Sequence, residues 1–109
     1  SSLLQGCVAV RADFAEEYPE VMEKFLEEYR ASVEYITTAD DAADIIADCG
    51  IVPSAAIAKK ALPNCNIMYL AGDEMKTQLS GFLSVLFEAD PTSVGGKLPA
   101  DDFYYGAAK

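Results

Sequence analysis

The chain has 109 residues, of which 51% are apolar and 24% are charged; this composition is typical of one globular domain and not of a disordered segment. Eighteen acidic residues against eight basic ones give a net charge of −10. This charge disfavours binding to nucleic acid or to an anionic membrane surface, because both require clustered lysine and arginine. The sequence has no histidine and therefore lacks the commonest general base and metal ligand.

Three cysteines, Cys7, Cys49 and Cys65, are too few and too widely spaced for a zinc knuckle or a disulfide framework. We expect all three to be small buried side chains, the usual role of a free cysteine. The four aspartates between positions 40 and 48 lack the spacing of a calcium-binding loop. We therefore expect no metal and no cofactor.

Two segments have the composition of β-strands. Residues 3–10 are mostly apolar on both alternating faces, which is typical of a strand buried on both sides in a parallel or mixed sheet. Residues 66–70, between Pro63 and Gly72, form a shorter candidate strand. Two strands are too few for a stable open sheet, so the sequence predicts a sheet that is incomplete in this chain.

Four segments have helical periodicity. The first, residues 19–36, begins at Pro19 after a short turn that Asp13 could cap, and its apolar stripe is Val21, Met22, Phe25, Leu26, Tyr29, Val33 and Ile36. The second is capped by Thr38 or Asp40 and stops at Gly50, and the third lies between Pro53 or Ser54 and Pro63. The fourth, residues 74–88, follows Asp73 and has the stripe Met75, Leu79, Phe82, Leu83, Leu86 and Phe87.

The last 21 residues show no periodic pattern and contain Pro91, Gly95, Gly96, Pro99 and Gly106. A segment of this kind is expected to wrap another surface. Together these features predict an α/β fold with about four helices around a small mixed sheet and an irregular C-terminal tail. The unfinished sheet predicts either a piece of a larger protein or a chain that completes its sheet with another copy.

The ordered motifs of the chain resemble a known family. The first is GCVAVRADFAEEYPEVMEKFLEEYRASVEYI, from Gly6 to Ile36, and the last is the ending NIMYLAGDEMK…SVGGKLPADDFYY. This set resembles the C-terminal part of the nitrate/sulfonate/taurine-type ABC transporter substrate-binding proteins, and the resemblance covers nearly the whole chain. It implies part of a bilobed periplasmic-binding-protein type II fold, an incomplete lobe here, in which two lobes close on a small molecule and deliver it to a membrane permease.

The resemblance also implies a division of the chain. Residues 1–71 would form the later part of the second lobe, and residues 72–109 a helix and tail that return to the first lobe, where Phe103, Tyr104 and Tyr105 would pack. It further implies an extracytoplasmic location, periplasmic or anchored as a lipoprotein at the outer face of the cytoplasmic membrane, and an ABC transporter permease as partner.

Six residues are candidates for ligand contact. Gly72, Asp73 and Glu74 begin a helix whose free N–H groups suit a carboxylate, sulfonate or phosphate. Tyr69 could stack on a planar ligand, and Ser1 and Ser2 precede the strand that approaches the cleft in the family. Capping or packing is the simpler explanation for each of these residues. Because the resemblance implies that most ligand contacts lie upstream, this chain alone is expected to bind small molecules weakly or not at all.

Two other functions compete with the receptor. A self-associating interaction domain would use the apolar stripe of residues 74–88 together with Phe103, Tyr104 and Tyr105, and a homodimer through exposed apolar surface is expected of a truncated lobe. Pyrimidine-synthase-like enzymes share the fold implied by the resemblance, but they depend on histidine and clustered cysteines, which are absent here. No phosphate-binding glycine loop or nucleophile elbow is present, so the sequence does not predict an enzyme.

Overall fold

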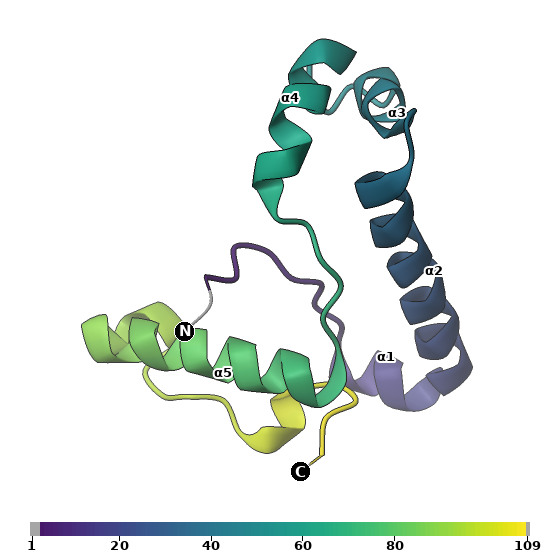
Figure 1. Cartoon of the computed structure of the whole chain (residues 1–109). Coiled ribbons are helices and arrows are strands. Elements are labelled where there is room, and N and C mark those ends of the chain that lie inside the picture. Colours follow the sequence, from purple (N-terminus) through teal and green to yellow (C-terminus); the bar gives the residue numbers. More distant parts are fainter. Residues whose placement is uncertain (1–2, 109) are drawn as a thin grey trace. The chain divides into compact units, whose positions relative to one another are not determined.

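The computed structural model describes residues 3–108, and they form helices and irregular connections only (Figure 1). The five α-helices are α1 (Ala12–Glu17), α2 (Pro19–Thr38), α3 (Ala42–Asp48), α4 (Ala55–Cys65) and α5 (Gly72–Ala89). Two short 3-10 helices, η1 (Pro91–Val94) and η2 (Asp101–Phe103), follow α5. No strand occurs in this part of the chain, so the predicted α/β fold with a mixed sheet is wrong, and the described residues are all-α.

Both predicted strands are irregular segments in the structure. Residues 3–10 and 66–70 have no regular secondary structure, and apolar side chains such as Val8 and Met68 are exposed. A strand is stable only when its N–H and C=O groups bond to a neighbouring strand. The two segments lie almost entirely in different compact units, so neither unit supplies the partner that its segment needs. Local composition alone misled the prediction.

The chain divides into two compact units. We call Val10–Tyr69 the helical unit, and Ser1–Ala9 with Leu70–Lys109 the terminal unit. The helical unit contains α1 to α4, and the terminal unit contains α5, η1 and η2. The predicted division after residue 71 refers to the lobes of a larger protein and stays a prediction.

Local signals explain where the helices of the helical unit begin. Pro19 is the first residue of α2, as predicted, because its fixed φ suits a position where the missing N–H is not needed. The short turn predicted at Asp13 is α1, whose N-cap is Arg11, and the Asp13 carboxylate pairs with the Arg11 guanidinium. Ser54 caps α4 by accepting a hydrogen bond from the Ile57 N–H at 3.3 Å.

The core of the helical unit lies where α3 packs against α4. Ala43, Ile46 and Ala58 are buried there. Three partly buried side chains, Ile36, Val52 and Leu62, pack around them. The connection from α2 to α3 is fixed by a hydrogen bond from the Tyr35 hydroxyl to the Asp41 carboxylate. This bond raises the pKa of Tyr35, since the hydroxyl can donate only while it is protonated.

Much of the apolar surface expected to be buried is exposed. In α2 only Met22 is buried, whereas Val21, Phe25 and Tyr29 of the same stripe are exposed. The helix was therefore predicted correctly, and the structure adds that three residues of its apolar stripe are exposed. The prediction that the cysteines are buried is wrong, because Cys7, Cys49 and Cys65 are all exposed free thiols.

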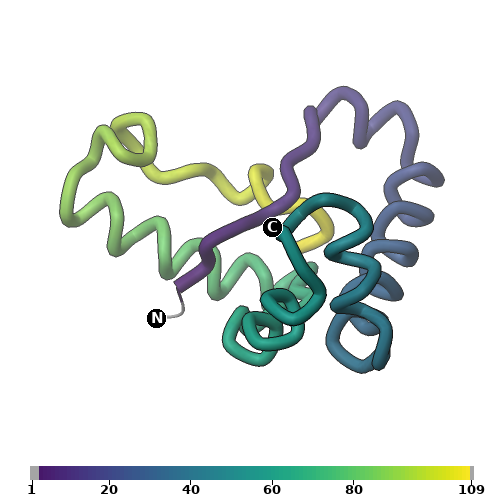
Figure 2. Tube along the Cα trace, turned by 90° about the horizontal axis from the view of Figure 1, so that it is seen from above, coloured from purple at the N-terminus to yellow at the C-terminus, as the bar shows by residue number. Residues whose placement is uncertain are grey.

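The terminal unit is built on α5. The tail turns at η1, which is capped by Asp90, and then runs back along α5 (Figures 1 and 2). Tyr104 in this returning segment is buried, with 6% of its surface exposed, whereas Phe103 is 60% exposed. The tail was predicted to wrap another surface, whereas in the structure it runs along α5 of the same chain.

Candidate functional site

The first turn of α5 contains three of the predicted ligand residues. Gly72 has φ of +60°, a left-handed conformation that glycine adopts without strain. The N-cap residue Ala71 offers no side-chain hydrogen bond, while Asp73 and Glu74 place two carboxylates in the first turn. Negative charge at this end is favourable because the helix dipole is positive there. The same two carboxylates make the local charge unfavourable for an anionic ligand.

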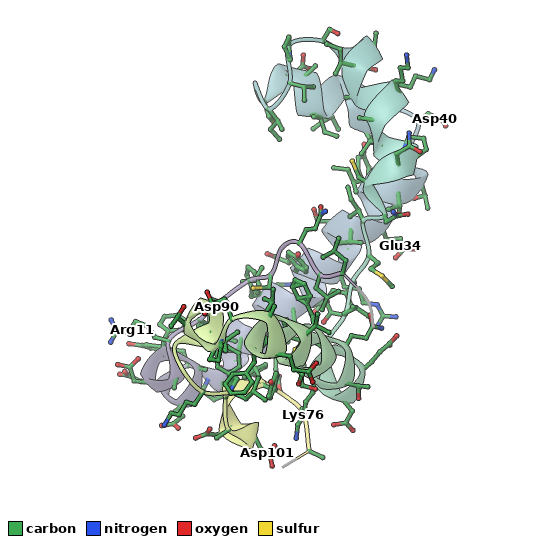
Figure 3. All side chains as sticks on the ribbon, turned by 90° about the vertical axis from the view of Figure 1, so that its left-hand side faces the viewer. Arg11, Glu34, Asp40, Lys76, Asp90 and Asp101 are labelled. Carbon is green, nitrogen blue, oxygen red and sulfur yellow. The ribbon has the colours of Figure 1, made fainter. Side chains whose placement is uncertain are left out.

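The end of the tail forms hydrogen bonds with the first two turns of α5. The Asp73 carboxylate accepts a hydrogen bond from the Ala108 N–H at 2.7 Å. The Lys76 ammonium donates to the Ala108 carbonyl at 3.0 Å and pairs with Asp101 at 3.1 Å. Figure 3 shows Lys76 and Asp101 close together where the tail passes α5. Asp73 and Lys76 thus hold the N–H and the C=O of the same residue.

Tyr104 completes this arrangement. The Lys76 ammonium lies 5.9 Å from the centre of the Tyr104 ring, within the range of a cation–π interaction. Phe103 meets the same ring edge-on, with 5.2 Å between the ring centres. We call Asp73, Lys76, Asp101, Tyr104 and Ala108 the α5–tail cluster. It brings together two parts of the sequence that are about 30 residues apart.

The other predicted ligand residues lie elsewhere. Tyr69 belongs to the helical unit, where the centre of its ring lies 5.9 Å from the centre of the Tyr29 ring. The Arg30 guanidinium lies 5.9 Å from the centre of the same Tyr69 ring. Its half-buried ring therefore already has an aromatic neighbour and a cation. Ser1 and Ser2 lie outside the described residues. Ligand contact by these three residues, and by Gly72, Asp73 and Glu74, stays a prediction.

The helical unit also has a broad groove that the sequence did not predict. Its volume is about 550 Å³, and it lies between the last turns of α2 and α4 and the start of α3. Thr38, Asp40, Lys59, Pro63 and Ile67 are among the residues that line it. Asp40 and Lys59 give it opposite charges, and both side chains are in exposed residues. No local motif identifies the groove, because it forms only when the two helix ends come together.

Two carboxylates among the described residues have a lowered pKa. The pKa of Asp13 is lowered chiefly by its hydrogen bond to Arg11, and that of Asp90 by the hydroxyl and the N–H of Thr92. Both carboxylates are exposed and serve local turns. Within residues 3–108 no three metal-ligating side chains come together in a group suited to a metal ion.

Comparison of the chain with protein-family models, curated proteins and solved structures finds no match. None of the described helices combines the length and the apolar character needed to cross a bilayer.

Proposed function

We propose that the chain is part of an extracytoplasmic solute-binding protein that captures a small molecule between two lobes and delivers it to an ABC permease. The proposal rests on the ordered motifs from GCVAVRADF to GGKLPADDFYY. The fold class does not support the proposal, since the described residues form no sheet. It assigns ligand contact to residues of this chain and no catalytic step.

One contact supports the proposal most directly. The motif GDEMK supplies Asp73 and Lys76, and the motif KLPADDFYY supplies Asp101 and Tyr104. These residues meet in the α5–tail cluster, through the Lys76–Asp101 ion pair and the Lys76–Tyr104 approach. The two motifs that carry the resemblance are therefore physically coupled, which gives a reason for them to occur together.

The exposed apolar surface gives further support. Large apolar side chains are exposed in both units: Val21, Phe25, Ile51 and Ile57 in the helical unit, and Leu3, Val8 and Val85 in the terminal unit. Burial of an exposed apolar side chain is worth roughly 1.5–3 kcal/mol. A chain with this surface is suited to be covered by further polypeptide, as a segment of a larger receptor would be.

The experiment is a thermal-shift measurement on the complete gene product, with the 109-residue chain in parallel. The panel contains nitrate, bicarbonate, alkanesulfonates, taurine and pyrimidines. A ligand at about 100 times its dissociation constant stabilises the native state by about 2.7 kcal/mol. We expect one class to raise the melting temperature of the complete product and to have little effect on the 109-residue chain alone.

A matched pair of variants tests the site. Glu74 and Glu88 are both exposed carboxylates of α5, near its start and its end respectively. Glu74→Gln is expected to change the dissociation constant of the ligand, whereas Glu88→Gln is expected to leave it unchanged. If both variants bind with the wild-type constant, Glu74 is not a ligand contact. If no ligand class shifts the complete product, the receptor proposal fails.

Self-association is the second candidate function, and the α2 stripe favours it. Val21, Phe25 and Tyr29 form an exposed apolar row on a 20-residue helix, and such a row is a common dimer surface. Light scattering separates the two proposals. A dimer formed by both the complete product and the 109-residue chain, and abolished by Phe25→Ser, would favour self-association. A dimer formed only by the shorter chain would favour the receptor.

A further inference from the structure

The returning tail has the parts of a movable strap. We call residues 97–108 the strap. It follows Gly95 and Gly96, which have φ of +80° and +91°. Side chains rarely adopt this conformation, so both positions require glycine, and no heavy atom lies within 4 Å of a Cβ built at either one. No packing contact at the Cβ positions restricts the two glycines, but their N–H groups donate to the Thr92 and Pro91 carbonyls at 3.2 and 2.9 Å. The strap can therefore turn only about the backbone bonds that follow these two hydrogen bonds.

The far end of the strap is held by a small number of polar contacts. Among the described residues, all side-chain hydrogen bonds and ion pairs between the strap and α5 involve Asp73 or Lys76. Lys76 alone supplies two of these contacts and also lies near the Tyr104 ring. The Asp101 side chain is 65% exposed, so its ion pair with Lys76 is open to screening by salt.

The contacts with Ala108 involve its main chain. Asp73 accepts from the Ala108 N–H, and Lys76 donates to the Ala108 carbonyl. The first two turns of α5 therefore bind the main chain of Ala108, and neither contact involves its side chain. Asp73 and Lys76 are both occupied while the strap is in place, and both become free together when it leaves.

We propose that residues 97–108 form a hinged strap that turns about Gly95 and Gly96 and closes on Asp73 and Lys76 of α5. Opening frees one carboxylate and one ammonium at the start of α5 and exposes the Tyr104 ring. Any group that binds to Asp73 or Lys76 must first displace the strap. The proposal concerns the chain itself and does not depend on the receptor proposal.

Amide hydrogen exchange tests the strap, with Lys76→Met as the main variant. Lys97→Met is the matched control, because Lys97 lies in the strap and forms no ion pair among the described residues. We expect Lys76→Met to speed exchange at the protected amides of residues 101–108 by about tenfold, because two charge-assisted contacts are lost. Exchange in α5 and η1 is expected to stay unchanged, and Lys97→Met is expected to behave as wild type.

A salt titration of the unmodified chain provides a second test that does not depend on a variant. Raising the ionic strength from about 0.05 M to about 0.5 M is expected to speed exchange in residues 101–108 more than in α5, because the Lys76–Asp101 pair is screened. If residues 101–108 exchange at the rate of α5 and respond to neither salt nor Lys76→Met, the tail is a fixed part of the unit. If Lys76→Met speeds exchange along all of α5, the strap does not open independently. Either result would overturn the proposal.

Discussion

The two compact units are stabilised in different ways. The helical unit has an apolar cluster of Ala43, Ile46 and Ala58 where α3 meets α4. The terminal unit has no fully apolar cluster of this kind among its described residues; α5 has no buried side chain, and Tyr104 is the buried residue of the unit. Its tail is attached by the polar contacts of Asp73 and Lys76. The helical unit therefore depends mainly on packing, and the terminal unit on one aromatic ring and a few polar contacts.

This difference has a consequence for cooperativity. Packing energy is spread over several side chains and is lost gradually when one of them is shortened. In the terminal unit, by contrast, the attachment of the tail depends on one buried ring and the polar contacts of two residues, so a change at any of these is expected to loosen the tail specifically. We therefore expect a substitution in one unit to change the stability of that unit mainly, since sites without shared contacts act independently.

The largest effect is expected from Tyr104→Ala. Removing a buried aromatic ring leaves a cavity and also removes the group next to the Lys76 ammonium, at a cost of about 3 kcal/mol. Phe103→Ala is the control, because Phe103 is the next residue and is largely exposed, and its loss is expected to cost about 0.5 kcal/mol or less. Urea unfolding, monitored by hydrogen exchange, would measure the loss of stability in both variants. Equal losses would show that the Tyr104 ring contributes no more than an exposed one.

Ile46→Ala is expected to have the next largest effect, in the other unit. Ile46 is the largest side chain of the buried cluster, but its neighbours Ile36, Val52 and Leu62 are only partly buried and can close part of the cavity. We therefore expect a loss of about 2 kcal/mol, at the low end for such a change. Faster hydrogen exchange should appear in α3 and α4 but not in α5. A matching increase in α5 would mean that the two units unfold together.

The sequence was sufficient to predict the helices, because helix formation depends on neighbouring residues. Pro19, Ser54 and the apolar periodicity of residues 19–36 and 74–88 are local signals, and α2, α4 and α5 begin at or within two residues of the predicted positions. Pro63 was predicted to end its helix, but α4 continues through it to Cys65. Strands depend on a partner that is distant in the sequence, so the apolar alternation of residues 3–10 did not produce a strand. An apolar stripe also does not by itself show burial, since Val21 and Phe25 are exposed.

The candidate site was only partly predictable. Gly72, Asp73 and Glu74 were recognised as a helix start, which the structure has at that position. The α5–tail cluster was not recognised, because Asp73 and Ala108 are 35 residues apart and Ala108 contributes only backbone atoms. A contact made by backbone leaves no residue type in the sequence to identify it. The groove between α2 and α4 was missed for a related reason, since it depends on where two helices end in space.

A smaller effect is expected from Ser54→Ala, which tests how much the cap of α4 contributes to the helical unit. The Ser54 hydroxyl satisfies the Ile57 N–H at the start of the helix, and loss of such a cap costs about 1 kcal/mol. Ser54→Asp should retain most of the stability, because an aspartate can accept the same hydrogen bond. If the alanine and aspartate variants are equally stable, the cap contributes nothing measurable to the unit.

The smallest effect concerns Asp90, where the tail leaves α5. Its carboxylate accepts hydrogen bonds from the Thr92 hydroxyl and the Thr92 N–H, and these bonds hold its pKa below the reference value of 3.8. Since the pKa is lowered in the folded chain, the stabilisation is fully present above pH 3.8 and is lost as the pH falls through the folded pKa. An NMR titration of the Asp90 carboxyl carbon should therefore have its midpoint below 3.8. Thr92→Val removes the hydroxyl but keeps the N–H, so the midpoint should move part of the way back toward 3.8. An unchanged midpoint would mean that the Thr92 hydroxyl does not lower the pKa of Asp90, and that the turn from α5 into the tail is fixed by the backbone alone.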